Sequence, residues 1–406
     1  MFSTTTPPKS RPCTQAFESV ASRHMSRKLF GTDHDLFRSS VREFVEREVA
    51  PNIDKWEAAG IVDKEMFRKA GSAGLLGMAV PEGYGGGGVP DFRFNAVIAE
   101  ELVYAGGLGV GLCITLHNDV VTPYFIELAD DEQRDRWLPG IASGELMTAV
   151  AMTEPGAGSD LASIATSAIR DGDHYVVNGS KTFITNGINS DLILTAVKTN
   201  PAERHAGMSL IVVEDGMEGF TRGRNLAKVG LHAQDTAELF FEDVHVPVEN
   251  LIGQEGRGFL HLVQNLPQER LSIAVGSIAH AQAAFDWTLA YVKERQAFGQ
   301  PIGTFQTIKH NMAEMRTELD IAQTYVDSQI LALNAGELSA DEAAKGKWWV
   351  TEMENRVIDR CLQLFGGWGY MEEYPIARAF RDARVQTIYG GTTEIMKEII
   401  GRSLGL

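Results

Sequence analysis

The chain has 406 residues and a formal net charge of -17, with 44% hydrophobic and 22% charged residues. A chain of this length exceeds one ordinary hydrophobic core, so two or three domains are expected. The acidic balance argues against nucleic acid and against an anionic membrane surface as partners, because both require basic protein surface. No apolar run approaches the roughly 20 residues of a spanning helix, so no membrane insertion is predicted.

The three cysteines, Cys13, Cys113 and Cys361, are odd in number and widely separated. This spacing provides neither a disulfide framework nor a Cys-x-x-Cys metal site, and we predict no bound metal. Free thiols are typical of a reducing compartment. Together with the acidic pI near 5.1, they favour a bacterial cytoplasm, with the mitochondrial matrix as the alternative.

The first segment, residues 1–26, is rich in Ser, Thr and Pro and carries Lys9, Arg11 and Arg23 against the single acid Glu18. This composition predicts a disordered or leader-like tail. A misassigned start codon, with translation beginning at Met25, is the alternative.

Residues 27–145 are predicted to form a helical domain. Phe37, Val41 and Phe44 recur at spacings of four and three, as on one buried helix face. Glycines accumulate between residues 105 and 111. They indicate either a loop or room for a deep pocket.

Residues 146–258 are predicted to form a β-domain. β-branched and aromatic residues flank Asn178-Gly179, which predicts a hairpin at that dipeptide. Further strand-like runs lie at residues 192–197, 208–213 and 237–244. Because no helical segment separates them, they indicate an antiparallel barrel or sandwich rather than a βαβ unit.

Residues 259–406 are again helical in pattern. Long amphipathic segments at residues 277–295, 306–335 and 340–364 are joined by short loops, which predicts a helical bundle. The expected fold class is therefore α+β multidomain.

Residues 83–88 formally fit the Gly-x-Gly-x-x-Gly pattern of dinucleotide binding. That pattern requires a preceding strand and a following helix within a βαβ unit, whereas Val89-Pro90 follows here. We therefore predict a loop, and any flavin must be held by another fold.

A glycine-rich turn follows a predicted strand at residues 153–160, Thr-Glu-Pro-Gly-Ala-Gly-Ser-Asp. The backbone N–H groups and hydroxyls of such a turn can surround a flavin edge or a phosphate, although an ordinary turn is the alternative. Thr185 adds a further hydroxyl on a neighbouring segment.

Residues 151–160 and residues 363–373, Gln-Leu-Phe-Gly-Gly-Trp-Gly-Tyr-Met-Glu-Glu, resemble the two signature stretches of the acyl-CoA dehydrogenase family. The resemblance runs from about residue 26 to the C-terminus and is strongest to the long-chain acyl-CoA dehydrogenase subgroup. It implies an N-terminal α-helical domain, a central β-barrel or sandwich and a C-terminal four-helix bundle. It also implies non-covalent FAD, a homotetramer and an electron-transfer flavoprotein as partner.

The position of the catalytic base separates the subgroups of this family. In most members a Glu follows an Ile-Tyr pair, but here Gly390 follows Ile388-Tyr389. In the long-chain subgroup the base lies on an upstream helix, and residues 266–271, Leu-Pro-Gln-Glu-Arg-Leu, match it with Glu269 in the base position. The helical pattern alone allows two interpretations of Glu269. It is either a partly exposed acid at the edge of the apolar stripe or a buried acid on that stripe. Burial would raise its pKa, as a base for a weak carbon acid requires.

The resemblance also implies which residues bind the ligands. Thr153 and Ser159 lie along the flavin. Thr185 hydrogen-bonds near flavin N5, and Phe183 packs on the ring where many relatives have Trp. Arg295, whose planar fork suits a pyrophosphate, reaches the FAD of a neighbouring subunit together with Phe298 and Gln306. The implied cofactor-binding residues are Met152, Thr153, Gly158, Ser159, Phe183, Ile184, Thr185, Arg295, Phe298, Gln306, Gln363, Leu364, Gly366, Gly367, Thr392 and Glu394. The implied substrate-binding residues are Ser159, Arg270, Tyr389, Gly390 and Gly391.

The implied reaction is the α,β-dehydrogenation of a medium-to-long-chain fatty acyl-CoA to the trans-2-enoyl-CoA. Glu269 removes the α-proton, the β-hydrogen passes as hydride to flavin N5, and the electrons go to the electron-transfer flavoprotein. The alternatives are an isovaleryl- or other branched-chain dehydrogenase, a flavin monooxygenase-like or nitroalkane-oxidising relative, and a non-catalytic acyl-CoA-binding paralogue.

Overall fold

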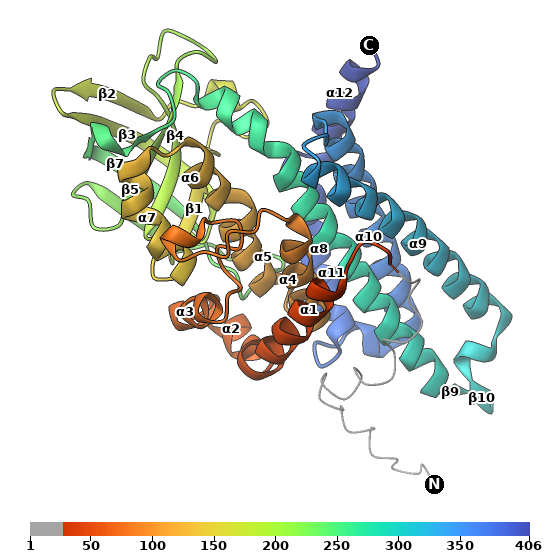
Figure 1. Ribbon diagram of the computed structural model, residues 1–406. Helices are drawn as coiled ribbons and strands as arrows, with labels where there is room; N and C mark the ends of the chain where they lie inside the picture. The colour runs from red at the N-terminus through yellow and green to blue at the C-terminus, as the bar shows by residue number, and fades with distance from the viewer. Residues whose placement is uncertain (1–26) are drawn as a thin grey trace.

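The computed structural model describes residues 27–406, so the predicted tail at residues 1–26 lies outside the described part of the chain. Short N-terminal helices adjoin both a central β-sheet and a set of long C-terminal helices (Figure 1). This is the predicted order of helical, β and helical parts.

The N-terminal part is built from short helices. α1 buries Val41 and Phe44 of the predicted face together with His34, while Phe37 of that face is only partly buried. The glycines near residue 110 do not form a loop throughout, because α5 begins at Leu108 and includes Gly111. The α-helices are α1 (Thr32–Phe44), α2 (Ile53–Ala59), α3 (Lys64–Ser72), α4 (Phe92–Tyr104), α5 (Leu108–Thr115), α6 (Thr122–Leu128) and α7 (Asp131–Ser143).

A π-helical segment, η5 (Leu116–Val121), links α5 to α6. π-Helical turns are rare and frequently mark functional sites. η5 runs beside β1 and the longest helix of the chain, and it contributes to the candidate site described below.

The central sheet has the strand order β6-β7-β3-β2-β4-β5-β8, with β1 pairing to β4. Most neighbouring strands are antiparallel, as expected. The expectation is wrong for β1 with β4 and for the single pair of β2 with β4, which are parallel. β2 and β3 intervene in the chain between β1 and β4, and a connection of that length permits parallel pairing. The strands are β1 (Thr148–Ala151), β2 (Ser167–Asp171), β3 (His174–Thr185), β4 (Leu192–Lys198), β5 (Met208–Glu214), β6 (Phe220–Asn225), β7 (Thr236–Pro247) and β8 (Leu251–Ile252).

The predicted hairpin at Asn178-Gly179 is wrong. β3 continues through this dipeptide, and the turn between β2 and β3 lies at Gly172. Asn178 instead exchanges two hydrogen bonds of 2.9 Å with Asp243 on β7. Gly179 lies where the β3–β7 register is irregular, and a Cβ there would lie 2.7 Å from Thr166 Cα. The dipeptide therefore forms a bulge with a close backbone approach, not a turn.

The C-terminal helices pack side by side around a core of buried apolar side chains. α8, with 37 residues, is about 55 Å long at 1.5 Å per residue. The short β9–β10 hairpin lies at the end of the bundle far from the sheet (Figure 1). The elements are α8 (Gly258–Glu294), β9 (Gln296–Ala297), β10 (Gln300–Pro301), α9 (Gln306–Asn334), α10 (Ala340–Phe365), α11 (Pro375–Ala383) and α12 (Thr393–Ser403).

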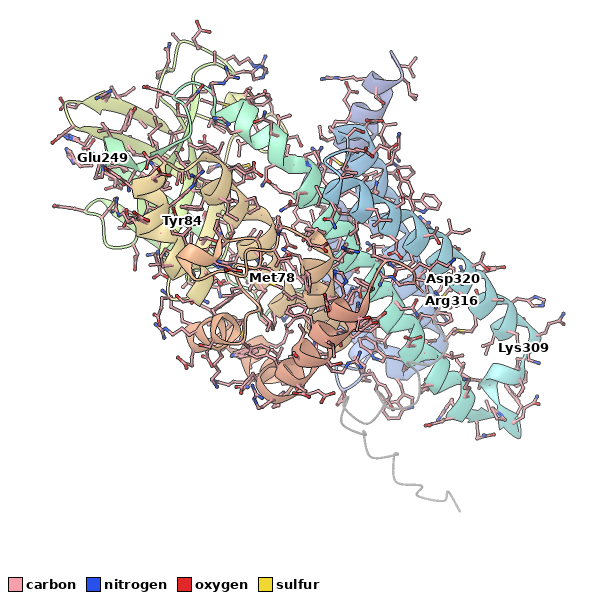
Figure 2. The ribbon with its side chains drawn as sticks, viewed as in Figure 1. Met78, Tyr84, Glu249, Lys309, Arg316 and Asp320 are labelled. Carbon is pink, nitrogen blue, oxygen red and sulfur yellow. The ribbon has the colours of Figure 1, made fainter. Side chains whose placement is uncertain are left out.

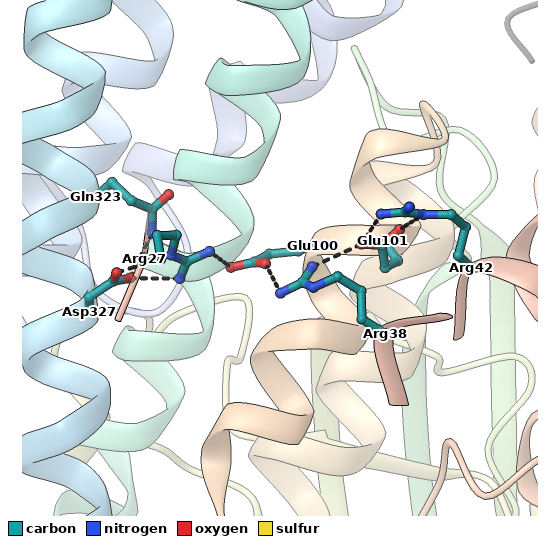
Figure 3. Close-up of polar contacts among 7 residues, drawn as sticks. All are labelled: Arg27, Arg38, Arg42, Glu100, Glu101, Gln323 and Asp327. Atoms are coloured by element: carbon teal, nitrogen blue, oxygen red, sulfur yellow. Dashed lines mark hydrogen bonds and ion pairs between the residues drawn. The ribbon is translucent and has the colours of Figure 1, made fainter. Parts of the chain in front are cut away.

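A buried ion network joins α4 to α1 and α9 (Figure 3). Arg27 pairs with Glu100 at 2.5 Å and with Asp327 at 2.6 Å. Arg38 pairs with Glu100 at 2.7 Å and with Glu101 at 2.8 Å. Burial acts to raise the pKa of Glu100, but Arg27 and Arg38 outweigh it, and that pKa lies below its usual value. Because each charge is paired, the network holds α4 in place without leaving a buried charge uncompensated.

Within residues 27–406, no helix combines the length and the apolar character that crossing a bilayer requires.

Candidate active site

An apolar cavity of about 130 Å³ lies between the N-terminal helices, β1 and α8. Glu269 contributes a carboxylate to a lining that is otherwise apolar or uncharged. Three predicted site residues besides Glu269, namely Met152, Tyr389 and Gly390, also line this cavity. The lining residues are Ala99, Val103, Leu108, Gly111, Leu112, Thr115, Leu116, Val120, Val150, Met152, Glu269, Ser272, Ile273, Gly276, Gln386, Tyr389 and Gly390.

Glu269 is buried, with 4% of its surface exposed. Its Oε1 accepts a hydrogen bond from Tyr124 Oη at 2.9 Å and another from Asn265 Nδ2 at 3.1 Å. Burial raises the pKa of Glu269 to about 7, against the lowering effects of Tyr124, Asn265 and Arg270. A carboxylate with this pKa can accept a proton efficiently near neutral pH.

Gly390 lies on the cavity wall beside Ile273. Its φ is 64°, and a Cβ on it would lie 2.3 Å from Ile273 Cδ1. Both the left-handed backbone conformation and the close approach of Ile273 favour glycine at position 390. The structure therefore has a carboxylate at position 269, and a side chain at position 390 would require the end of Ile273 to move.

Two basic side chains hold the backbone around Gly390. Arg270 Nε lies 3.5 Å from the Gly390 carbonyl oxygen, and Lys347 Nζ donates to the Gly391 carbonyl oxygen at 2.7 Å. Lys347 is fully buried, and burial, followed by repulsion from Arg270, lowers its pKa to about 7. The sequence prediction included Arg270 and Gly391 but missed Lys347. The sequence shows Lys347 only as a lysine among small residues of an amphipathic helix. A lysine in such a pattern is usually solvated.

One face of α8 is fastened to η5 by polar contacts. Asn265 Nδ2 donates to the Val120 carbonyl oxygen at 2.9 Å, and Gln268 Nε2 donates to the Asp119 carbonyl oxygen at 2.8 Å. Ser272 Oγ donates to Asp119 Oδ2 at 2.5 Å. Burial raises the pKa of Asp119 to about 6. These contacts fix the helix that carries Glu269 relative to the cavity.

The glycine-rich turn at residues 153–160 is fixed to β3 next to the cavity. Thr182 N–H donates to the Thr153 carbonyl oxygen at 2.9 Å, and Lys181 Nζ donates to the Met152 carbonyl oxygen at 3.1 Å. Lys181 also pairs at 2.8 Å with Glu154, and both side chains are buried. This pair is a structural support of the turn that the sequence did not reveal.

The same turn and β3 present a surface suited to a planar aromatic group. The β3–β7 register is irregular between Lys181 and Ile184, and Phe183 has a φ of 59° and 68% exposure. A strained, exposed aromatic side chain at a bulge is typical of a binding site. A Cβ on Gly158 would meet no atom within 4 Å, so the turn is open on that side. A cofactor with a flat ring fits beside Phe183, with the hydroxyls of Thr153 and Thr185 on the same two segments.

Other predicted cofactor residues have different surroundings. The Ile184 side chain is buried in the core of the sheet, and Leu364 packs against the core of the bundle. Ser159 is exposed. Thr392 caps α12 by accepting a hydrogen bond from Ile395 N–H at 3.4 Å, and Glu394 is exposed in the first turn of that helix.

A second group of predicted cofactor residues lies at the far end of the bundle. Arg295 follows the last residue of α8, about 39 Å from Glu269 at 1.5 Å per residue. Phe298 is 94% exposed at the β9–β10 hairpin. Lys309, near the start of α9, marks this end in Figure 2, remote from Glu249 beside the sheet. The structure therefore does not bring this group to the cavity within one chain. The group consists of Arg295, Phe298, Gln306, Gln363, Gly366 and Gly367.

Within the described residues, no group of three or more His, Cys, Asp and Glu side chains could hold a metal ion.

Comparison with known proteins decides the family. Family models for the acyl-CoA dehydrogenase N-terminal, middle and C-terminal domains match residues 31–145, 149–244 and 256–405. The chain belongs to the acyl-CoA dehydrogenase family. It is accordingly an FAD-dependent oxidoreductase that acts on CH–CH groups, and the resemblance and fold class predicted from the sequence are confirmed.

Individual relatives match this chain over nearly its whole length. The mitochondrial long-chain specific acyl-CoA dehydrogenase of Sus scrofa is 47% identical over 380 residues, covering 93% of this chain and 88% of that protein. A crystal structure of acyl-CoA dehydrogenase from Geobacillus kaustophilus is 50% identical with a TM-score of 0.91, covering 93% of this chain and all of that one. A glutaryl-CoA dehydrogenase from Mycobacterium smegmatis in complex with FADH2 is 26% identical with a TM-score of 0.86, covering 93% and 95% of the two chains.

Proposed function

We propose that Glu269 removes the α-proton of a fatty acyl-CoA thioester and that the product is the trans-2-enoyl-CoA. The observation that supports this most strongly is a buried carboxylate on the wall of an apolar cavity, with glycine at position 390. An α-proton beside a thioester is weakly acidic, so its removal needs a base whose pKa lies near the working pH. The pKa of Glu269, raised by burial to about 7, meets that need.

The thioester carbonyl needs a hydrogen-bond donor, because negative charge develops on its oxygen as the proton leaves. We propose the backbone N–H of Gly390 as one such donor. Arg270 and Lys347 contact the carbonyl oxygens of Gly390 and Gly391. They thereby restrain the two peptide planes that follow this N–H, which supports a fixed path for the segment that carries it.

When bound, FAD supplies the acceptor for the β-hydrogen. We propose that one set of residues binds it from the chain that carries the cavity, and that a second set binds the FAD of a neighbouring subunit in a homotetramer. The separation of about 39 Å along α8 supports this division. The first set is Met152, Thr153, Gly158, Ser159, Phe183, Ile184, Thr185, Thr392 and Glu394. The second set is Arg295, Phe298, Gln306, Gln363, Leu364, Gly366 and Gly367.

The acyl chain is proposed to occupy the apolar cavity and to be of medium to long length. Small residues on three helices, Ala99, Gly111 and Gly276, line the cavity and leave it room. A Cβ on Gly276 would meet nothing within 4 Å. We further propose an electron-transfer flavoprotein as electron acceptor and a bacterial cytoplasm as the location.

The test is a screen of the purified FAD-containing protein against straight acyl-CoAs of increasing length, with isovaleryl-CoA and other branched thioesters beside them. We expect the flavin absorbance to bleach fastest with medium-to-long straight chains. Preference for a branched thioester would indicate the branched-chain alternative. Rapid reaction of the reduced protein with oxygen would indicate the monooxygenase-like alternative, and no reduction by any thioester would indicate a binding protein.

The base is tested by Glu269→Gln, which is nearly isosteric but cannot accept the proton. Flavin reduction should slow by at least about 10²–10⁴-fold, while flavin content and ligand binding stay unchanged. Glu127→Gln is a control for the same chemical change, because Glu127 on α6 is exposed and does not line the cavity. Reduction of Glu269→Gln at the parental rate would show that the base is another group.

A further inference from the structure

The two carboxylate oxygens of Glu269 have different surroundings. Oε1 accepts hydrogen bonds from both Tyr124 and Asn265. Among the residues that the structure describes, Oε2 accepts none, and it is not one of the fully buried atoms without a partner. One oxygen is therefore occupied, while the other borders the cavity that Glu269 lines.

The two donors are themselves fixed. Asn265 lies one helical turn before Glu269, and its amide nitrogen also donates to the Val120 carbonyl oxygen at 2.9 Å. Tyr124 lies on α6, immediately beyond η5, and only 2% of its surface is exposed. The donors thus approach Oε1 from two different elements, which restrains the χ angles of the glutamate more tightly than one donor would.

We propose that Tyr124, assisted by Asn265, is a positioning residue for proton abstraction: it holds Oε1 so that Oε2 faces the α-carbon of the substrate. The proposal rests on the proposed role of Glu269 as base. Neither donor needs to touch the substrate, because both act through the carboxylate.

The same contacts set the acidity of the base. A hydroxyl that donates to a carboxylate stabilises the charged form more than the neutral acid. Loss of the Tyr124 hydroxyl should therefore raise the pKa of Glu269 further above its value of about 7, and leave less base at neutral pH. The other titratable or charged groups around Glu269 are Arg270 on α8, Asp119 on η5 and Tyr389 at the cavity wall. All three remain in a Tyr124 variant.

The test is Tyr124→Phe, with Tyr175→Phe as the matched control. Tyr175 is also 2% exposed and its hydroxyl is also influenced by a nearby carboxylate, that of Glu255, but it lies in the core of the sheet. The measurement is the pH profile of single-turnover flavin reduction by a saturating acyl-CoA. In Tyr124→Phe the acidic limb should move up by about one pH unit, the shift expected for one charge-assisted hydrogen bond. Substrate affinity should stay unchanged, and the control should follow the parental profile.

Infrared titration of the Glu269 carboxyl group, identified by the band that Glu269→Gln removes, gives a readout that does not depend on turnover. The band should titrate at higher pH in Tyr124→Phe, and in Asn265→Leu as a second variant. An unmoved acidic limb together with an unmoved band would overturn the proposal. If Glu269→Gln keeps the parental rate, the proposed function fails. If Glu269→Gln is inactive but Tyr124→Phe behaves like the parent protein, only the positioning role fails.

Discussion

Moving the proposed base from position 269 to position 390, its other expected place in the family, tests the geometry of the cavity wall. The double variant Glu269→Ala with Gly390→Glu removes the buried carboxylate and adds one at the other position. The φ of Gly390 is 64°, and its added Cβ would lie 2.3 Å from Ile273 Cδ1. A left-handed side-chain residue costs about 1–2 kcal/mol, and forcing Ile273 off its rotamer costs about 0.5–1.5 kcal/mol. We expect the double variant to be less stable by roughly 2–3 kcal/mol and to recover only part of the activity.

The structure also predicts how to improve that variant. Adding Ile273→Val removes the Cδ1 methyl that meets the new side chain, so the triple variant should reduce flavin faster than the double variant. The assays are stopped-flow flavin reduction with a saturating acyl-CoA and thermal unfolding at one protein concentration. The double variant could instead keep the parental stability and rate, and Ile273→Val could leave both unchanged. That result would show that the segment around Gly390 adapts freely and that Ile273 does not limit the space for a side chain at position 390.

Three further variants test separate parts of the site. Arg295→Ala should weaken FAD retention about tenfold to a hundredfold, measured as flavin released on dilution; unchanged flavin content would make Arg295 an ordinary surface residue. Lys181→Met leaves Glu154 as a buried unpaired charge and should lower the free energy of unfolding by about 3–5 kcal/mol, measured by denaturant titration. The control Lys55→Met breaks an exposed pair and should cost at most about 1 kcal/mol in the same titration. Glu269→Gln should be more stable than the parent protein at pH 8 but not at pH 4. The raised pKa makes the folded state bind more protons than the unfolded state between about pH 4.5 and 7, so this burial lowers stability as pH rises through that window; equal unfolding midpoints at both pH values would contradict this.

The family resemblance of two short motifs was sufficient to predict that positions 269 and 390 belong to one site. Glu269 and Gly390 each lie inside a short segment whose residue order resembles a family motif, and the structure places both on one cavity wall, while the role of Glu269 as base stays a prediction. The partners of Glu269 could not be inferred in this way. Tyr124 is 145 positions away in the chain, and its contact depends on how α6 packs against α8. Asn265, four residues before Glu269 on the same helix, was within reach of a helical-spacing argument.

The failed hairpin shows the same limit for local structure. Asn-Gly is a strong turn signal when only neighbouring residues are considered. In this chain the outcome was decided by Asp243, which lies on a different strand and exchanges hydrogen bonds with Asn178. Glycine was still required, but because of the close approach of Thr166 rather than because of a turn.

Two opposing influences on Glu269 determine what the cavity can do. Burial raises the pKa of the carboxyl group, and the donors Tyr124 and Asn265 lower it. With weaker burial, the pKa would fall toward its usual value and the carboxylate would be a weaker base. With no donors, the pKa would rise further and less of the group would be charged at neutral pH. An acyl chain entering the cavity displaces water and increases burial, so the pKa should rise further once substrate is bound. Because both donors occupy Oε1, they oppose that rise and, on the proposed role of Glu269, leave Oε2 free to take the proton.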